Sequence, residues 1–311
     1  MIDLEPDRRL TEAQAETLLG AWLAVPTACS AITAIDGGMV NSVFRLEFDQ
    51  APHRAVVKIH GAGSDTFTSE ARGLEYLRTV TACPVPRVYA HDSSARLVPH
   101  AFLLVEDVPG VCLAAANLTP VERAGIEVEL ASVLGELHGH RSARWGSVET
   151  GGDAPHWGDL FARRLGEARA HVEASRRLSD DLLVRVDASI RLARRALGDA
   201  GRPTLVHGDV WDGNLMVDRR EGRWGLAALL DPDLQFADVE LELAYLEVFG
   251  AHREKFFDAY ADLHPRRPGY EERRLFYWLH TALVHVALFG DQFFCDYTAQ
   301  VLEQIDHHWG G

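Results

Sequence analysis

The pattern of apolar and polar residues changes character about one third of the way along the chain. Residues 11–23 repeat apolar side chains at helical spacing, and Thr11 with Gln14 has the spacing of a capping box, so a helix is expected there. From about residue 31 the pattern becomes that of short strands with turn-like links. The expected strands lie at residues 43–48, 55–59, 85–89 and 101–105.

One helix interrupts these strands. Its apolar positions recur at helical spacing behind a cap at Ser64 or Asp65, and Pro84 and Pro86 end it. The positions expected to be buried are Phe67, Ala71, Leu74 and Leu77. The sequence therefore predicts a small N-terminal lobe that combines strands with one helix.

Beyond a Pro109-Gly110 hinge the chain turns helical. Thr119, Pro120 and Glu122 form a helix start, with a cap, a first-turn proline and a capping box. Further helices are expected at 157–175 and 179–197, and three or four more after residue 233. The fold class is α+β, with an N-terminal lobe at 1–107 and a helical C-terminal lobe at 108–311.

The helical pattern is interrupted at residues 204–233, where the sequence reads as strand, tight loop and strand. Asp209, Asn214 five residues later and Asp231 after the next strand are expected to converge at one end of a hairpin. Phosphoryl transfer needs such a set, because a carboxylate accepts the proton of the attacking hydroxyl while Asn and Asp oxygens hold Mg²⁺. His207 is expected to brace this loop rather than to transfer protons.

The N-terminal lobe offers groups that would complement this set. Lys58 lies within a predicted strand, which is unusual for an ammonium without anionic partners, and Glu70 in the next helix is placed to pair with it. Gly37, Gly38 and Asn41 belong to a turn of small residues whose backbone amides would face phosphates. Each feature alone is weak, but their order along the chain favours a kinase.

Composition excludes several other classes. The 311 residues carry 31 basic and 46 acidic side chains, a net charge of −15, which argues against a nucleic-acid partner. Four scattered cysteines indicate neither a disulfide framework nor a zinc site, and no long apolar run indicates a membrane span, so a cytoplasmic protein is expected. A Walker-type nucleotide hydrolase is disfavoured because its phosphate-binding motif is absent.

The order of these features resembles the aminoglycoside phosphotransferase and protein-kinase-like superfamily, and within it the fructosamine (ketosamine) kinase family. The resemblance covers roughly residues 31–305 and implies a two-lobed protein-kinase-like fold. The segments that carry it are Gly37-Gly38-Met39-Val40-Asn41, His207-Gly208-Asp209-Val210-Trp211-Asp212-Gly213-Asn214, Asp231-Pro232 and Glu240-Leu241-Glu242-Leu243-Ala244.

The resemblance implies ATP and Mg²⁺ as cofactors, Asp209 as the catalytic base, and Asn214 and Asp231 as the magnesium ligands. Lys58 would bind the α- and β-phosphates, and backbone groups of the hinge would hold the adenine. The nucleotide-binding residues implied are Gly37, Gly38, Asn41, Lys58, Glu70, Glu106, Asp107 and Val108.

The acceptor side is expected to be acidic and to attract an amine-bearing sugar. Its candidate residues are Trp211, Asp212, Asp233 and Glu240, of which Trp211 either stacks on a sugar or packs under the loop. Asp212 and Asp233 depart from the usual ketosamine kinase pattern. A ketosamine is the expected acceptor, an aminoglycoside antibiotic is the alternative, and a pseudokinase scaffold is a third reading. Glu242 is expected to brace the catalytic loop.

Overall fold

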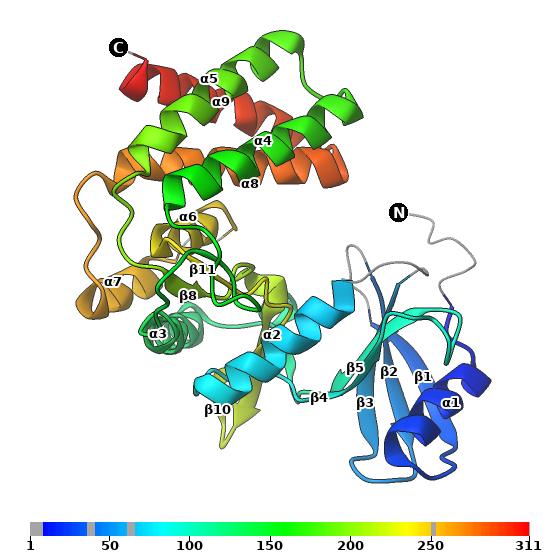
Figure 1. Ribbon diagram of the computed structural model, residues 1–311. Coiled ribbons are helices and arrows are strands. Elements are labelled where there is room, and N and C mark those ends of the chain that lie inside the picture. Colours follow the sequence, from blue (N-terminus) through cyan, green and yellow to red (C-terminus); the bar gives the residue numbers. More distant parts are fainter. Residues whose placement is uncertain (1–8, 36–40, 61–65, 250–252, 311) are drawn as a thin grey trace. The chain divides into compact units, whose positions relative to one another are not determined.

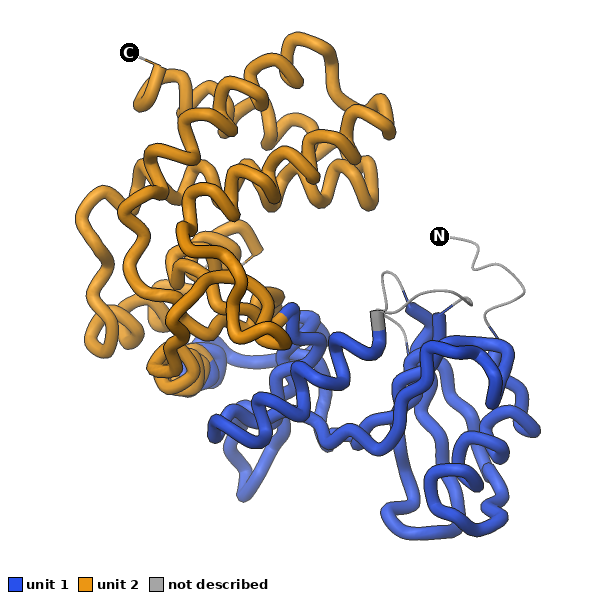
Figure 2. The backbone as a smooth tube through the Cα atoms, in the orientation of Figure 1, with its two compact units in different colours: residues 1–126, 213–233 blue, residues 127–212, 234–311 orange. Residues whose placement is uncertain are grey.

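The computed structural model describes residues 9–35, 41–60, 66–249 and 253–310. Contacts within the chain define two compact units, residues 1–126 with 213–233 and residues 127–212 with 234–311 (Figure 2). The first unit therefore extends beyond residue 107 and includes a later hairpin. The lobe boundary at 107 and 108 stays a prediction.

The first unit contains a five-stranded antiparallel sheet with the order β1-β2-β3-β5-β4 (Figure 1). β5 is buried along almost its whole length, as its apolar sequence predicts. The strands are β1 (Cys29–Ile35), β2 (Ser42–Phe48), β3 (Arg54–His60), β4 (Val88–Asp92) and β5 (Ala101–Glu106).

Helix α1 (Glu12–Leu23) begins with the predicted capping box, in which Thr11 and Gln14 exchange side-chain hydrogen bonds with each other's backbone. Its buried residues Leu18 and Leu19 join a core cluster with apolar side chains of the sheet, including Leu46 and Val57. The predicted helix is confirmed.

Helix α2 (Thr66–Val80) buries the four predicted positions Phe67, Ala71, Leu74 and Leu77. Its predicted cap at residues 64 and 65 lies outside the described residues.

The strand expected at 85–89 begins later, at Val88. Pro86 has no N–H for a ladder, and the Val85 carbonyl accepts a hydrogen bond from the Arg78 side chain at 3.2 Å, so these residues do not pair with β5.

A second sheet of the first unit has the order β10-β9-β6. Its strands are β6 (Val111–Cys112), β9 (Leu215–Arg220) and β10 (Arg223–Leu229). Gly110, just before β6, has φ +110°, and a Cβ there would lie 2.1 Å from the Val217 carbonyl oxygen, so only glycine fits. The predicted Pro-Gly turn thus permits a close backbone approach to β9.

The second unit is mainly helical. Within it α4 contacts α5 and α8, and α9 packs on α8 (Figure 1). Trp157 and Tyr277 lie in this core, where the indole N–H donates to the phenol oxygen at 3.0 Å. The helices are α3 (Pro120–Leu137), which begins in the first unit, α4 (Trp157–Ser175), α5 (Asp180–Ala196), α6 (Val239–Phe249), α7 (Glu254–Leu263), α8 (Tyr270–Phe289) and α9 (Gln292–Trp309).

The second unit also contains a short sheet with the order β7-β11-β8. β8 (Thr204–Val206) pairs with β11 (Gln235–Ala237), which pairs in turn with β7 (Gly146–Ser147). Asn214 and Asp231 flank the β9–β10 hairpin and Asp209 lies outside it, so the expected convergence of Asp209 with these two residues stays a prediction. β8 bonds to a strand about 30 residues further on, so Asp209 follows β8 in the second unit, whereas β9 and β10 form the hairpin of the first.

Candidate active site

Lys58 is the centre of a charged cluster in the first unit. It lies in β3 with only 8% of its surface exposed, and its ammonium contacts Glu70 Oε1 of α2 at 2.7 Å. The same ammonium contacts Asp231 Oδ1, just after β10. The predicted Lys58–Glu70 pair is present, and a lysine buried inside a strand has the anionic partners that it requires.

The electrostatics of this cluster follow from its burial. Burial lowers the pKa of the Lys58 ammonium, but Asp231 and Glu70 outweigh it, so the pKa lies above its ordinary value. Burial raises the pKa of Glu70 to about 7, although Lys58 acts in the opposite direction. Lys58 therefore stays charged, and Glu70 takes up a proton more easily than an exposed glutamate does.

Asn214 and Asp231 lie just outside the open end of the β9–β10 hairpin, one before β9 and the other after β10. The backbone carbonyl oxygen of Asn214 accepts a hydrogen bond from the Leu230 N–H at 2.8 Å. This bond places Asn214 beside the residue that precedes Asp231. Asp231 has φ 56°, in the left-handed region that a non-glycine residue seldom adopts. An amide oxygen and a carboxylate are hard donors suited to Mg²⁺.

The loop after β8 is held in the second unit by Glu242 of α6. Glu242 Oε1 accepts the Gly208 N–H at 2.7 Å, and Oε2 accepts the His207 N–H at 3.2 Å. The Asp209 N–H donates to His207 Nδ1 at 3.4 Å. The predicted bracing roles of Glu242 and His207 are confirmed.

Glu242 is itself anchored by a buried chain of hydrogen bonds. His138 Nε2 lies 2.6 Å from Glu242 Oε2, and His138 Nδ1 lies 2.6 Å from the Tyr260 hydroxyl of α7. Burial alone would raise the pKa of Glu242. The interactions of its carboxylate with His138, His207 and the Gly208 N–H outweigh burial, so the pKa of Glu242 lies below its ordinary value. A buried carboxylate thus fixes the backbone that precedes Asp209.

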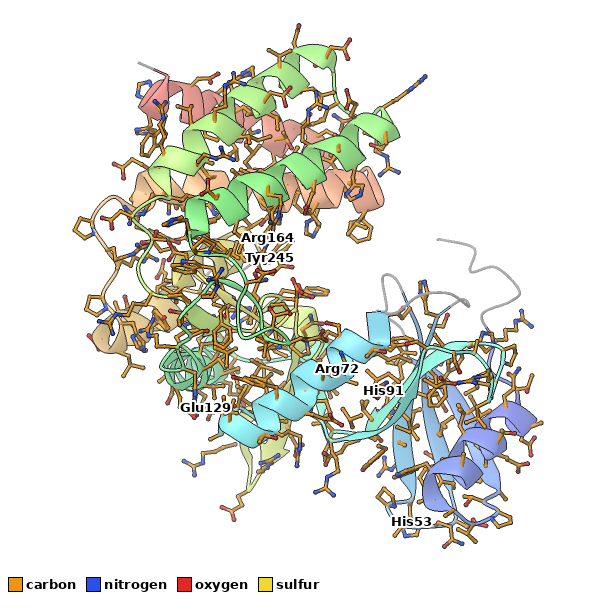
Figure 3. The ribbon with its side chains drawn as sticks, in the orientation of Figure 1. His53, Arg72, His91, Glu129, Arg164 and Tyr245 are labelled. Atoms are coloured by element: carbon orange, nitrogen blue, oxygen red, sulfur yellow. The ribbon has the colours of Figure 1, made fainter. Side chains whose placement is uncertain are left out.

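Tyr245 is a site residue that sequence reasoning missed. Its hydroxyl donates to Asp209 Oδ1, and it comes from α6, three residues after Glu242 (labelled in Figure 3). That spacing puts Tyr245 and Glu242 on neighbouring positions of one helix face. The three-residue spacing from Glu242 is therefore the feature of the sequence from which Tyr245 could have been predicted. Tyr245 orients the carboxylate that the sequence predicts to be the base.

Two predicted acceptor carboxylates are paired with arginines. Asp212 Oδ1 lies 2.5 Å from the buried Arg253 guanidinium. Glu240 is buried and contacts Arg267 at 2.9 Å and Arg273 at 2.7 Å. The charge of Glu240 is thus balanced inside the protein, and its expected acceptor role stays a prediction. Asp233 is exposed and Trp211 half-buried, and their acceptor roles stay predictions.

Some groups of the predicted adenine-binding segment already bond to other residues of the protein. The Glu106 N–H donates to the Arg87 carbonyl oxygen at 2.9 Å, and the Asp107 carboxylate contacts Arg45 at 3.0 Å. The role of the Val108 backbone stays a prediction.

The phosphate-binding turn is described only at its end. Gly37 and Gly38 lie outside the described residues. Asn41 Oδ1 lies 2.9 Å from His60 Nδ1 of β3, which ties the end of the turn to the strand that carries Lys58.

Comparison with known proteins decides the family. The sequence profile of the fructosamine kinase family matches residues 12–307. The chain belongs to the fructosamine kinase family. A relative in this family, a probable ketoamine kinase from Synechocystis sp., is 30% identical over 267 residues, which cover 83% of this chain and 84% of the relative.

Solved structures share the fold of this fructosamine kinase family member. A fructosamine-3-kinase candidate from Haemophilus somnus matches 94% of this chain and 96% of its own, with a TM-score of 0.76 and 19% identity. The aminoglycoside phosphotransferase APH(4)-Ia, in a ternary complex with AMP-PNP and hygromycin B, matches 94% of this chain and 97% of its own, with a TM-score of 0.65 and 18% identity. The predicted α+β, protein-kinase-like fold is confirmed.

Among the described residues, no helix is both long and apolar enough to cross a membrane.

Proposed function

We propose that this protein is an ATP-dependent kinase that phosphorylates a hydroxyl of a ketosamine. The observation that carries the proposal is the buried Lys58 ammonium with Glu70 and Asp231 around it. A buried ion-paired cluster is costly and adds little to stability, whereas an ammonium held in place beside a carboxylate suits the binding of phosphates. Membership of the fructosamine kinase family supports the same reaction.

Each residue has a defined task in the proposed reaction. Asp209 accepts the proton of the acceptor hydroxyl as the hydroxyl oxygen attacks the γ-phosphorus of ATP, and the bond from that phosphorus to the bridging oxygen breaks to release ADP. Tyr245 and the backbone held by Glu242 orient the Asp209 carboxylate. Lys58 holds the α- and β-phosphates, and Glu70 positions Lys58. Asn214 and Asp231 would hold Mg²⁺, which neutralises charge on the phosphates when bound.

The charges of the acceptor side favour a ketosamine over an aminoglycoside. A polyamine antibiotic needs several carboxylates whose charge is not already balanced, but Asp212 and Glu240 pair with Arg253, Arg267 and Arg273. A ketosamine carries one amine beside a hydroxyl-rich sugar and needs a single carboxylate to recognise it, for which the exposed Asp233 is the candidate. The name of the ketoamine kinase relative agrees with this choice.

The proposed compartment is the cytoplasm. All four cysteines are free thiols, which suits a reducing environment.

The decisive experiment measures ATP consumption with a panel of fructosamines, ribulosamines, free sugars and aminoglycosides, with Asp209→Asn as the inactive control. We expect turnover with the ketosamines and an acceptor KM that depends only weakly on salt, because one cation is recognised. Turnover confined to aminoglycosides, with a steep salt dependence, would contradict the acceptor. Nucleotide binding without any turnover would instead support a pseudokinase.

A further inference from the structure

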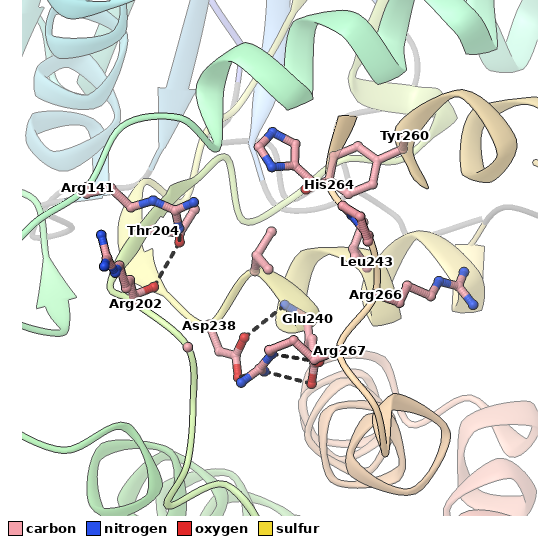
Figure 4. A pocket seen from close by; sticks show the side chains of 13 residues that line it. Arg141, Arg202, Thr204, Asp238, Glu240, Leu243, Tyr260, His264, Arg266 and Arg267 are labelled. Atoms are coloured by element: carbon pink, nitrogen blue, oxygen red, sulfur yellow. Dashed lines mark hydrogen bonds and ion pairs between the residues drawn. The ribbon is translucent and has the colours of Figure 1, made fainter. Parts of the chain in front are cut away.

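A cavity of about 250 Å³ lies in the second unit, and Asp209, Tyr245 and Glu242 are not among its lining residues (Figure 4). It opens at the Thr204 end of β8, whereas the loop that carries Asp209 follows the other end of that strand. Figure 4 shows Arg141, Arg202 and Thr204 on one side and His264 on the opposite side. The proposed kinase reaction assigns no task to this cavity.

Two of the arginines that line the cavity are already balanced by carboxylates. Arg267 contacts Asp238 at 2.5 Å and Glu240 at 2.9 Å. Arg266 contacts Glu247 at 3.2 Å and lies over the ring of Tyr270. These pairs fix the wall of the cavity and balance both carboxylates, Asp238 and Glu240, that line it among the described residues.

The other two arginines, Arg141 and Arg202, carry charge that the protein does not balance locally. Within the described part of the chain, neither lies within ion-pair distance of a carboxylate, and both are exposed. Arg141 is positioned by a backbone bridge to Thr204 and donates a hydrogen bond to the Thr204 hydroxyl. In a protein of net charge −15, two such guanidinium groups on one cavity wall are a local positive site.

We propose that this cavity binds a small phosphate-bearing anion. Guanidinium groups match phosphate oxygens with paired N–H donors, and two uncompensated positive charges favour a dianion. The Thr204 hydroxyl accepts a hydrogen bond from the Arg141 side chain and donates to the backbone carbonyl oxygen of Arg202 at 2.8 Å, so it positions both arginines at the cavity wall. Leu243 and Tyr260 supply an apolar wall for a short carbon skeleton.

The size of the cavity limits its ligand. Pockets for drug-sized molecules usually exceed about 300 Å³, so this one suits inorganic phosphate or a small phosphomonoester rather than a nucleotide. Tyr260 lines the cavity and also bonds to His138 in the chain that anchors Glu242. An occupant of this cavity therefore contacts a residue that is connected to the catalytic loop.

The test is titration calorimetry of inorganic phosphate into the full-length protein at constant ionic strength. All titrations use the Lys58→Met background, which removes phosphate binding at the proposed nucleotide site. We expect saturable binding of one phosphate, and a loss of affinity of about tenfold or more in Arg141→Gln/Arg202→Gln, since each arginine contributes charged hydrogen bonds. Arg191→Gln, an exposed arginine of α5 outside the cavity, is the matched control and should bind as the background does.

The absence of saturable binding up to about 10 mM phosphate would overturn the proposal, because weaker binding is not specific. Equal phosphate affinity in Arg141→Gln/Arg202→Gln and in the background would also overturn it. So would malonate binding as tightly as phosphate. ATP turnover of Arg141→Gln/Arg202→Gln with Lys58 intact should equal that of the wild type, which shows that the variant is folded. Failure of the kinase proposal would leave the phosphate titration unchanged, so the two conclusions are tested separately.

Discussion

The Glu242→Gln substitution gives the sharpest test of how the catalytic loop is held. The change keeps the shape of the side chain and removes its charge. Glu242 accepts from Gly208 N–H, His207 N–H and His138 Nε2, and both of its oxygens are used. A glutamine side chain has only one oxygen. Its amide nitrogen must therefore face N–H groups whose hydrogen bonds the carboxylate accepted.

The expected cost follows from the two backbone contacts, because the His138 imidazole can change its tautomer and accept from the glutamine amide. If the amide oxygen keeps the Gly208 N–H, the buried His207 N–H loses its acceptor, which costs about 1–3 kcal/mol. The remaining bond becomes neutral instead of charge-assisted and weakens by roughly 1 kcal/mol. We therefore expect the free energy of unfolding to fall by about 2–4 kcal/mol, which a domain of ordinary stability survives.

The same variant should slow catalysis more than it weakens nucleotide binding. The His207 and Gly208 backbone precedes Asp209, so a shift there misplaces the carboxylate, and an error of about 1 Å costs on the order of 10²-fold. We expect kcat to fall by about 10- to 100-fold with little change in the KM for ATP. Steady-state kinetics and urea unfolding of the same preparation measure both effects.

The pH dependence provides an independent check. Because the folded pKa of Glu242 is lowered, its contribution to stability is present above its ordinary value of 4.5 and is lost as the pH falls through the folded pKa. Glu242→Gln should therefore show a shallower loss of stability at acidic pH. Glu303→Gln, an exposed carboxylate of α9, is the control and should behave like the wild type. Wild-type kcat and urea midpoint in Glu242→Gln would refute the reasoning.

The remaining predictions concern groups at the proposed reaction centre. Asp209→Asn should lower turnover by about 10²–10⁴-fold while ATP binding persists, and unchanged turnover would exclude Asp209 as the base. Tyr245→Phe should lower kcat by roughly tenfold through a less well-oriented Asp209, and an effect on KM alone would argue against that role. Lys58→Met should impair ATP use more than Glu70→Gln, and the reverse order in kcat/KM for ATP would contradict the phosphate role. Asp231→Ala should raise the magnesium concentration needed for activity, and an unchanged magnesium titration would place the metal elsewhere.

The local sequence was enough to predict the elements whose hydrogen bonds or buried positions join residues close together in the chain. The caps at Thr11 and Thr119 join side chains to backbone groups three residues away, so short spacing was enough to predict them. The buried face of α2 repeats at helical spacing and was predicted for the same reason. Lys58 and Glu70 lie 12 residues apart, on a strand and the helix that follows, and their pairing was predicted from that order.

Other features depend on partners that no local pattern specifies. β8 pairs with β11 rather than with the neighbouring hairpin. Each of these two strands has only three residues, so the packing around them, and not their own short sequences, decides which strand each one pairs with. Tyr245 reaches Asp209 across 36 residues, and the bond exists only because α6 packs beside the loop.

The charges of the site show the same division. The sequence by itself determined which acidic residues lie in and soon after the catalytic loop along the chain, but not which carboxylates pair with cations. Asp212 meets Arg253 41 residues later, and Glu240 meets Arg267 and Arg273 at separations of 27 and 33 residues. A carboxylate's effective charge depends on the cations within a few ångströms, and only the tertiary structure brings those cations near.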